Sequence, residues 1–197
     1  MVFDGRDITG MPPHRIARMG IGRSFQRSNI FPRLTAFENV QTAVFSHHRQ
    51  GGHLWRPVHR FGPLNERVER ILESVGLADK RDRLGGKLAL GDQKRLEIGL
   101  ALALEPTLML LDEPTAGMSP EETASTVALI GRLAREFNVT LLFTEHDMAV
   151  VFGIAQTIWV LYYGGITACG SPQAIAEDPE VQRIYLGEKG AKGRFRG

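Results

Sequence analysis

The stretch that decides the fold reads Leu-Met-Leu-Leu-Asp-Glu-Pro, from Leu108 to Pro114. Four apolar residues in a row are too few for a helix but fit a short strand buried on both faces, with two carboxylates at its carboxyl end. That end is where open α/β sheets bind ligands. Asp112 is therefore a candidate to hold Mg²⁺, and Glu113 a candidate to orient or deprotonate an attacking water. The same residues also fit a buried strand that runs into a solvated acidic turn, so other segments must decide.

A second buried strand is predicted over Val139–Thr144, and a polar segment containing His146 follows it. The helix between the two strands opens with Ser119 and Glu122, which have the spacing of a capping box. A strand-helix-strand unit of this kind belongs to a parallel sheet and brings both carboxyl ends to one edge. We expect the helix to bury four apolar residues: Val127, Ile130, Ala134 and Phe137.

The residues before Leu108 are predicted to alternate short strands and helices. The chain starts with the end of a strand and a turn around Gly5, followed by a short helix that stops at Gly20. Ile21–Gln26 reads as a short strand with Gln26 at its end, and Thr35 with Glu38 predicts a second capping box. Residues 46–65 have no period and read as a loop, whose histidines lack the spacing of a metal site.

Two further helices are predicted between that loop and Leu108. Glu66–Val75 has one apolar face and ends at Gly76, a usual residue after a helix. The segment Leu88–Gln93 opens the other helix, which is expected to face inward with Leu96, Leu100, Ala103 and Leu104. After the second strand, a short helix over Met148–Ala155 and a hairpin around Gly164-Gly165 are expected.

Composition excludes several classes of protein. The 197 residues carry 24 basic and 22 acidic side chains, so the net charge of +2 gives no reason to expect a nucleic-acid partner. The single cysteine, Cys169, excludes an intrachain disulfide and suits a reducing compartment. The sequence has no apolar run long enough to span a bilayer and no signal-peptide pattern at its start. We therefore expect a cytoplasmic location.

Four motifs in order carry a resemblance to a known family. They are Gln26 after an aromatic residue, Leu-Ala-Leu-Gly-Asp-Gln before a helix, Leu-Leu-Asp-Glu-Pro-Thr, and His146 after a strand. In that order they resemble the Q-loop, signature motif, Walker B motif and H-loop of ATP-binding cassette (ABC) ATPases. The runs Asp-Glu-Pro-Thr-Ala-Gly-Met-Ser-Pro-Glu-Glu-Thr and Val-Gln-Arg-Ile-Tyr-Leu-Gly are most similar to the ATPase subunits of branched-chain amino-acid importers, with urea importers as close relatives.

The resemblance implies a role for each motif residue in binding and hydrolysing ATP with Mg²⁺. Glu113 would be the general base, Asp112 a Mg²⁺ ligand, Gln26 a sensor near metal and water, and His146 a donor to the γ-phosphate. The signature residues, together with Ser119 of the following D-loop, would meet the nucleotide of a second ATPase subunit in a homo- or heterodimer. These signature residues are Ala89, Leu90, Gly91, Asp92 and Gln93.

The sequence departs from the family pattern at four points. Ala89 replaces the signature serine and removes a hydroxyl donor, while Asp92 replaces the usual glutamine and puts a carboxylate near an anion. Ser119 replaces the D-loop aspartate, and it caps a helix but cannot make the same charged contact. No Gly-x-x-x-x-Gly-Lys-Ser/Thr occurs in the 197 residues, so the Walker A loop that cradles the phosphates is missing from them. We expect these residues alone to bind Mg-ATP poorly and not to hydrolyse it.

The resemblance and the patterns together predict an α/β fold. We expect a P-loop NTPase-type parallel core, residues 1–26 and 106–197, with an inserted helical subdomain over about 27–105, and without the family's first strands and P-loop. The predicted protein is the ATPase subunit of a branched-chain amino-acid importer, bound to integral-membrane permease subunits on the inner face of the cell membrane. Alternatives are a urea or amide importer ATPase, a soluble ABC ATPase acting on nucleic acid or ribosomes, and an incompetent truncated product that only binds partners.

Overall fold

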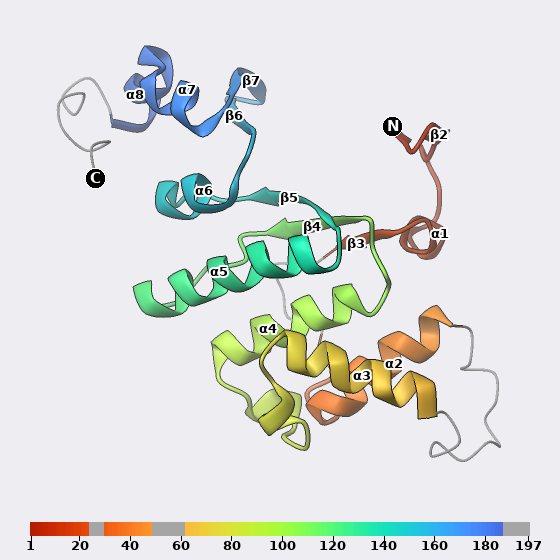
Figure 1. Ribbon diagram of the computed structural model, residues 1–197. Helices are drawn as coiled ribbons and strands as arrows, with labels where there is room; N and C mark the ends of the chain where they lie inside the picture. The colour runs from red at the N-terminus through yellow and green to blue at the C-terminus, as the bar shows by residue number, and fades with distance from the viewer. Residues whose placement is uncertain (24–29, 49–61, 187–197) are drawn as a thin grey trace. The chain divides into compact units, whose positions relative to one another are not determined.

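The computed structural model describes residues 1–23, 30–48 and 62–186 (Figure 1). These residues fall into two compact units, Met1–Thr144 and the segment from Glu145 onward, each with its own buried apolar side chains. None of the helices in the described ranges has the length and apolarity needed to cross a membrane.

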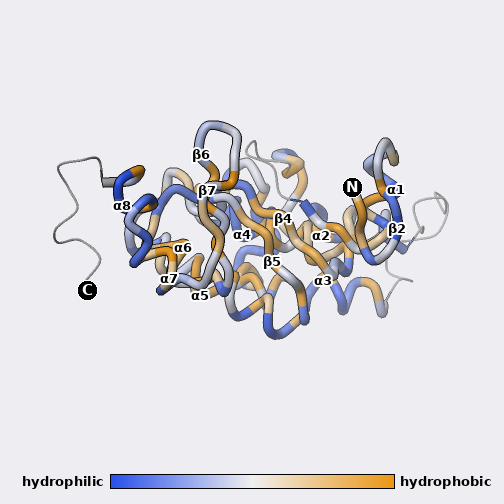
Figure 2. The backbone as a smooth tube through the Cα atoms, turned by 90° about the horizontal axis from the view of Figure 1, so that it is seen from above, coloured by the Kyte–Doolittle hydropathy of each residue, from blue (hydrophilic) through white to orange (hydrophobic). Residues whose placement is uncertain are grey.

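A three-stranded parallel sheet lies in the first unit, and it confirms the predicted α/β class. Its order is β3 (Ile21–Arg23), β4 (Leu108–Asp112) and β5 (Thr140–Thr144). The β4–β5 crossover runs through helix α5 (Pro120–Glu136), as the capping pattern predicted. The apolar run of β4 (Figure 2) therefore lies at the centre of the described sheet, as expected for its continuous hydrophobicity.

The burial of β4 and β5 differs from the prediction that both are covered on two faces. In β4, Met109 and Leu111 are buried, whereas the alternate positions are half-buried. In β5, Leu142 is 48% exposed. The physical reason is that successive side chains of a strand point to opposite faces, and α4 and α5 cover the face that carries Met109 and Leu141.

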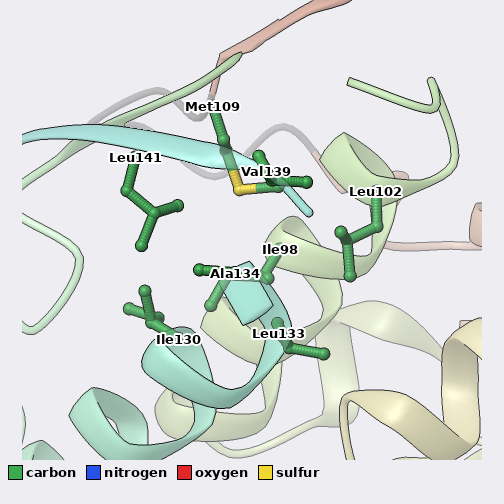
Figure 3. Close-up of a pocket in the computed structure, with 8 residues that line it drawn as sticks. All are labelled: Ile98, Leu102, Met109, Ile130, Leu133, Ala134, Val139 and Leu141. Carbon is green, nitrogen blue, oxygen red and sulfur yellow. The ribbon is translucent and has the colours of Figure 1, made fainter. Parts of the chain in front are cut away.

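The main core of the first unit lies between the sheet and two helices, α4 (Leu90–Leu102) and α5. Figure 3 shows side chains from α4, α5 and the strands β4 and β5, with Val139 just before β5, around a small apolar cavity. They are Ile98, Leu102, Met109, Ile130, Leu133, Ala134, Val139 and Leu141. The buried stripe of α5 is Thr126, Leu129, Ile130 and Leu133. Of the predicted Val127, Ile130, Ala134 and Phe137, Ile130 is buried and the other three are half-buried. The stripe is rotated because α5 packs against α4 as well as against the sheet.

Helix α4 is packed on more than the one inward face that the sequence predicted. It contacts α2 (Ala36–His47), α3 (Gly62–Ser74), α5 and β3. Leu96 and Ala103 are buried as predicted, but Leu100 and Leu104 are only half-buried. Ile98, Ala101 and Leu102 are its other buried apolar side chains, and Glu97 and Gly99 are buried with them.

Helices α2 and α3 pack together beside α4. Their fully buried side chains include Val40, Val44, Val68 and Leu72, and burying each one stabilises the fold by about 1.5–3 kcal/mol. The capping box of Thr35 and Glu38 is present, and Gly76 has a φ of +71° after α3, both as predicted. The predicted loop over 46–65 is too long, because α2 continues to His47 and α3 already begins at Gly62 with a proline in its first turn.

The first residues form a hairpin rather than only the end of a strand. Strands β1 (Val2–Phe3) and β2 (Arg6–Asp7) pair antiparallel, and Asp4 and Gly5 both have positive φ, as a tight hairpin turn requires. Helix α1 (Pro13–Arg18) follows and ends before Gly20, as predicted.

The described part of the second unit contains three helices and the predicted hairpin. Its elements are α6 (Met148–Ile154), β6 (Ile158–Tyr162), β7 (Gly165–Gly170), α7 (Pro172–Glu177) and α8 (Pro179–Leu186). Its core is formed by Val160, Ile175 and Val181. The predicted division into a core and a helical subdomain, 1–26 with 106–197 and 27–105, stays a prediction.

Candidate functional site

The carboxyl end of β4 carries the two acids that the sequence singles out. Asp112 is the last residue of the strand, and in the parallel register it lies opposite Thr144 of β5. The Thr144 hydroxyl donates a hydrogen bond of 2.5 Å to Asp112 Oδ1. The backbone N–H of Glu113 donates to the Thr144 carbonyl at 3.1 Å. Thr144 therefore orients the carboxylate of Asp112 and positions the backbone of Glu113.

A tight turn after β4 holds Glu113 in an unusual backbone conformation. Its φ is +45°, a left-handed value that costs a non-glycine residue about 1–3 kcal/mol. The turn is closed by a hydrogen bond from Ala116 N to the Glu113 carbonyl and is anchored by the buried Pro114 and Thr115. Gly117 follows with a φ of +79°, which glycine adopts without strain. These contacts therefore fix the backbone position of Glu113, from which its side chain extends.

The predicted signature residues form the first turn of α4. Ala89 is the N-cap residue, and it makes no side-chain capping hydrogen bond. Leu90 is 51% exposed, and Gln93 donates from its side chain to the Leu88 carbonyl at 2.9 Å. The first N–H groups of a helix have no intrahelical partner, and they carry the positive end of the helix dipole. The start of α4 is thus chemically suited to an anion such as phosphate.

Asp92 has a basic partner that the sequence did not reveal. Its Oδ2 lies 2.7 Å from Nζ of Lys80, in the turn Ala78–Lys80 that precedes the signature segment. The carboxylate is only 16% exposed. The expected carboxylate is therefore present near the start of α4, but Lys80 offsets its charge. Twelve residues separate the two side chains, so no periodic pattern in the sequence links them.

Ser119 and Glu122 form the predicted capping box at the start of α5. The Glu122 N–H donates to Ser119 Oγ at 3.3 Å, and the Ser119 N–H donates to Glu122 Oε2 at 2.9 Å. The other oxygen, Oε1, would lie 3.3 Å from a Cβ placed on Gly91. A Cβ on Gly117 would lie 3.5 Å from Leu90. The turn before α5 therefore contacts the first turn of α4, which brings two of the predicted motifs together.

Two predicted site residues are not placed beside this cluster. Gln26 lies outside the described residues. His146 belongs to the second unit, where it is exposed and its Nδ1 lies 3.8 Å from Glu145 Oε2. The predicted meeting of His146 and Gln26 with Asp112 and Glu113 stays a prediction.

The acids at β4 suit Mg²⁺ by their chemistry. Magnesium prefers oxygen ligands and is usually held by one or two carboxylates together with substrate phosphates rather than by a closed protein cage. In the described ranges no group of three or more histidine, cysteine, aspartate or glutamate side chains forms such a cage. A single strand-end carboxylate, oriented by Thr144, fits a cation that substrate phosphates help to hold.

Parts of this chain match known protein families. Residues 1–116 match the family described as ABC transporter, and residues 168–191 match the branched-chain amino acid ATP-binding cassette transporter family.

The similar proteins match most of this chain. The high-affinity branched-chain amino acid transport ATP-binding protein BraF of Pseudomonas aeruginosa is 40% identical over 191 residues, which are 94% of this chain and 75% of BraF. The lipopolysaccharide export system ATP-binding protein LptB of Haemophilus influenzae is 34% identical, over 96% of this chain and 74% of LptB. The crystal structure of MJ1267 in its ADP conformation, an ATP-binding cassette of an ABC transporter, superposes with a TM-score of 0.77 at 27% identity. That superposition covers 94% of this chain and 76% of MJ1267.

Proposed function

This chain belongs to the ABC transporter family of ATP-binding proteins, and on that premise we propose that it is the ATPase subunit of an importer for branched-chain amino acids. Two similarities support this substrate class. The 40% identity to BraF extends over 94% of the chain, and residues 168–191 match a family specific to branched-chain amino acid transporters. The identity to LptB, at 34%, is lower than the identity to BraF, so an importer is favoured over an exporter.

In this proposal Glu113 is the general base of ATP hydrolysis. A general base must lie within hydrogen-bond reach of the water that it deprotonates. The strained turn and its contact with Thr144 give the Glu113 backbone one position at the sheet edge, where parallel sheets bind ligands. His146 is assigned as donor to the γ-phosphate and Gln26 as sensor of metal and water, both from the family resemblance alone.

Asp112 would hold Mg²⁺ in this site, directly or through water. Thr144 engages Oδ1, so Oδ2 is the oxygen that we assign to the cation. When bound with ATP, Mg²⁺ neutralises charge that develops on the phosphates. Asp112 has the further role of accepting the Thr144 hydroxyl, which ties the ends of β4 and β5 together.

The signature segment acts on the nucleotide of a second ATPase subunit in this proposal. Ala89, Leu90, Gly91, Asp92 and Gln93 open a helix whose first N–H groups suit a phosphate, and Ser119 lies on the neighbouring turn. The proposal includes a homo- or heterodimer, permease subunits in the membrane and a cytoplasmic, peripheral location on its inner face.

The proposed function is tested by substituting Glu113 with glutamine. The amide keeps the shape of the side chain but cannot accept the proton of the water, so we expect hydrolysis to fall by about 10²- to 10⁴-fold while ATP binding is retained. Steady-state hydrolysis is measured in the assembled transporter, on a version of the subunit extended to carry a Walker A loop, beside uptake of labelled leucine, isoleucine, valine and urea. A rate within twofold of the parent would remove Glu113 from its role, and loss of urea uptake alone would assign a urea importer.

A further inference from the structure

The two carboxylate oxygens of Glu122 face two different turns. Oε2 accepts the Ser119 N–H and closes the capping box of α5, while Oε1 faces Gly91 in the first turn of α4. Glu122 and Gly91 lie 31 positions apart in sequence and in separate helices. A single side chain therefore joins the start of the signature helix to the turn that precedes α5.

The contact between these two turns is close enough to set their spacing. The glycine at position 91 has no Cβ, and an added Cβ would come to 3.3 Å from the carboxylate oxygen, closer than most van der Waals contacts. Leu90 meets Gly117 on the same interface, and Arg95 donates to Ser125 one turn further along both helices at 2.7 Å. The start of α5 and the first turns of α4 are therefore linked by the Arg95–Ser125 hydrogen bond and by close packing at Leu90 and Gly91.

We propose that Glu122 is a positioning residue for ATP hydrolysis, which fixes the first turn of α4 relative to the turn Gly117–Ser119. This inference rests on the proposed function, in which both turns face the nucleotide of the second subunit. The expected consequence is specific: loss of the Glu122 carboxylate misplaces the Ala89–Gly91 segment toward that nucleotide but leaves the acids at β4 in place. A displacement of about 1 Å in a catalytic arrangement lowers the rate by as much as 100-fold.

The chain contains a matched control for the capping role alone. Thr35 and Glu38 form the same box at α2, with the Thr35 N–H donating to Glu38 Oε2 at 2.7 Å. That box lies beside Leu84 and is not part of the candidate site. Replacing Glu38 removes a helix cap of the same type without touching Gly91.

The experiment compares Glu122→Ala with Glu38→Ala in the assembled transporter. We expect both to lower the urea midpoint of unfolding by a similar amount, because both lose the same cap. Only Glu122→Ala should lower kcat, by about tenfold or more, with little change in nucleotide affinity of the separate subunit. Glu122→Gln, which keeps the contact in shape, should retain kcat within about threefold.

Gly91→Ala by itself covers the case in which Glu122→Ala does not fold, because it should lower kcat in the parent, and an unchanged kcat would overturn the inference. Where both variants fold, a double-mutant cycle tests their coupling. Gly91→Ala crowds the same contact but leaves the α5 cap intact, and it should lower kcat less in a Glu122→Ala background than in the parent. Equal kcat losses in Glu38→Ala and Glu122→Ala, or additive effects of Gly91→Ala and Glu122→Ala, would overturn the inference. Unchanged hydrolysis in Glu113→Gln would instead overturn the proposed function on which it depends.

Discussion

Helices α4 and α5 begin side by side, yet their first turns are completed in opposite ways. At α5, Ser119 and Glu122 satisfy two backbone N–H groups with side chains of the helix itself. At α4, the N-cap is Ala89, whose methyl group accepts no hydrogen bond. Side-chain caps also start α2, α6 and α7, at Thr35, Asp147 and Ser171.

This difference separates a helix start built for stability from one suited to a ligand. In a capped N-terminus, side chains already accept hydrogen bonds from the first backbone N–H groups. In an uncapped one, these N–H groups can still donate to an anion. The chain gives up about 1 kcal/mol of helix stability at Ala89 compared with a serine, threonine, aspartate or asparagine cap. Three predictions test the comparison.

The largest effect is expected when the start of α4 is capped with a charge. Ala89→Asp supplies a capping carboxylate, so the fold should gain about 1 kcal/mol while the negative charge repels a phosphate at the same N–H groups. We expect the ATP-driven dimer to weaken at least tenfold, measured by sedimentation of catalytically inactive protein.

Ala89→Asn is the control for that prediction, because it caps the helix about as well without adding charge. It should stabilise the fold to a similar extent and weaken the dimer less than Ala89→Asp. Equal dimer constants for the parent and the two variants would show that the start of α4 does not face phosphate.

The second effect is the reverse change at α5. Ser119→Ala opens its first turn, and we expect the free energy of unfolding to fall by about 1 kcal/mol. Urea denaturation of the 197-residue chain measures this change. Equal free energies of unfolding for Ser119→Ala and the parent would contradict the assigned cap.

The smallest effect concerns acid and the second capping box. Hydrogen bonds from the Thr35 N–H and hydroxyl lower the pKa of Glu38 below its usual 4.5. A carboxyl with a lowered pKa contributes stability that is present above its unfolded pKa and is lost as pH falls through the folded value. Below about pH 4.5 the parent should therefore lose stability faster than Glu38→Gln. Parallel acid titration curves of the two, followed by circular dichroism, would show that the box contributes nothing.

Local sequence patterns predicted the elements that depend on neighbouring residues. Both capping boxes and the glycine after α3 follow from residues at most four or five apart, while the central strand and the hairpin of the second unit follow from a short apolar run and a Gly-Gly turn. Three of the four residues predicted for the stripe of α5, and the two-sided burial of β4 and β5, were predicted wrongly. Both depend on which elements cover a given face, and periodicity does not report this.

The sequence by itself determined the capped starts of α2 and α5, the position of Asp112 and Glu113 at the carboxyl end of β4, and the family to which the chain belongs. Only the tertiary structure decided that Thr144 bonds Asp112, that Lys80 offsets Asp92, and that Glu122 faces Gly91. The reason is physical, because the hydrogen bonds of caps and turns join residues within about one helical turn of each other. Contacts between residues 12 to 32 positions apart exist only after the sheet has set its register and the helices have packed.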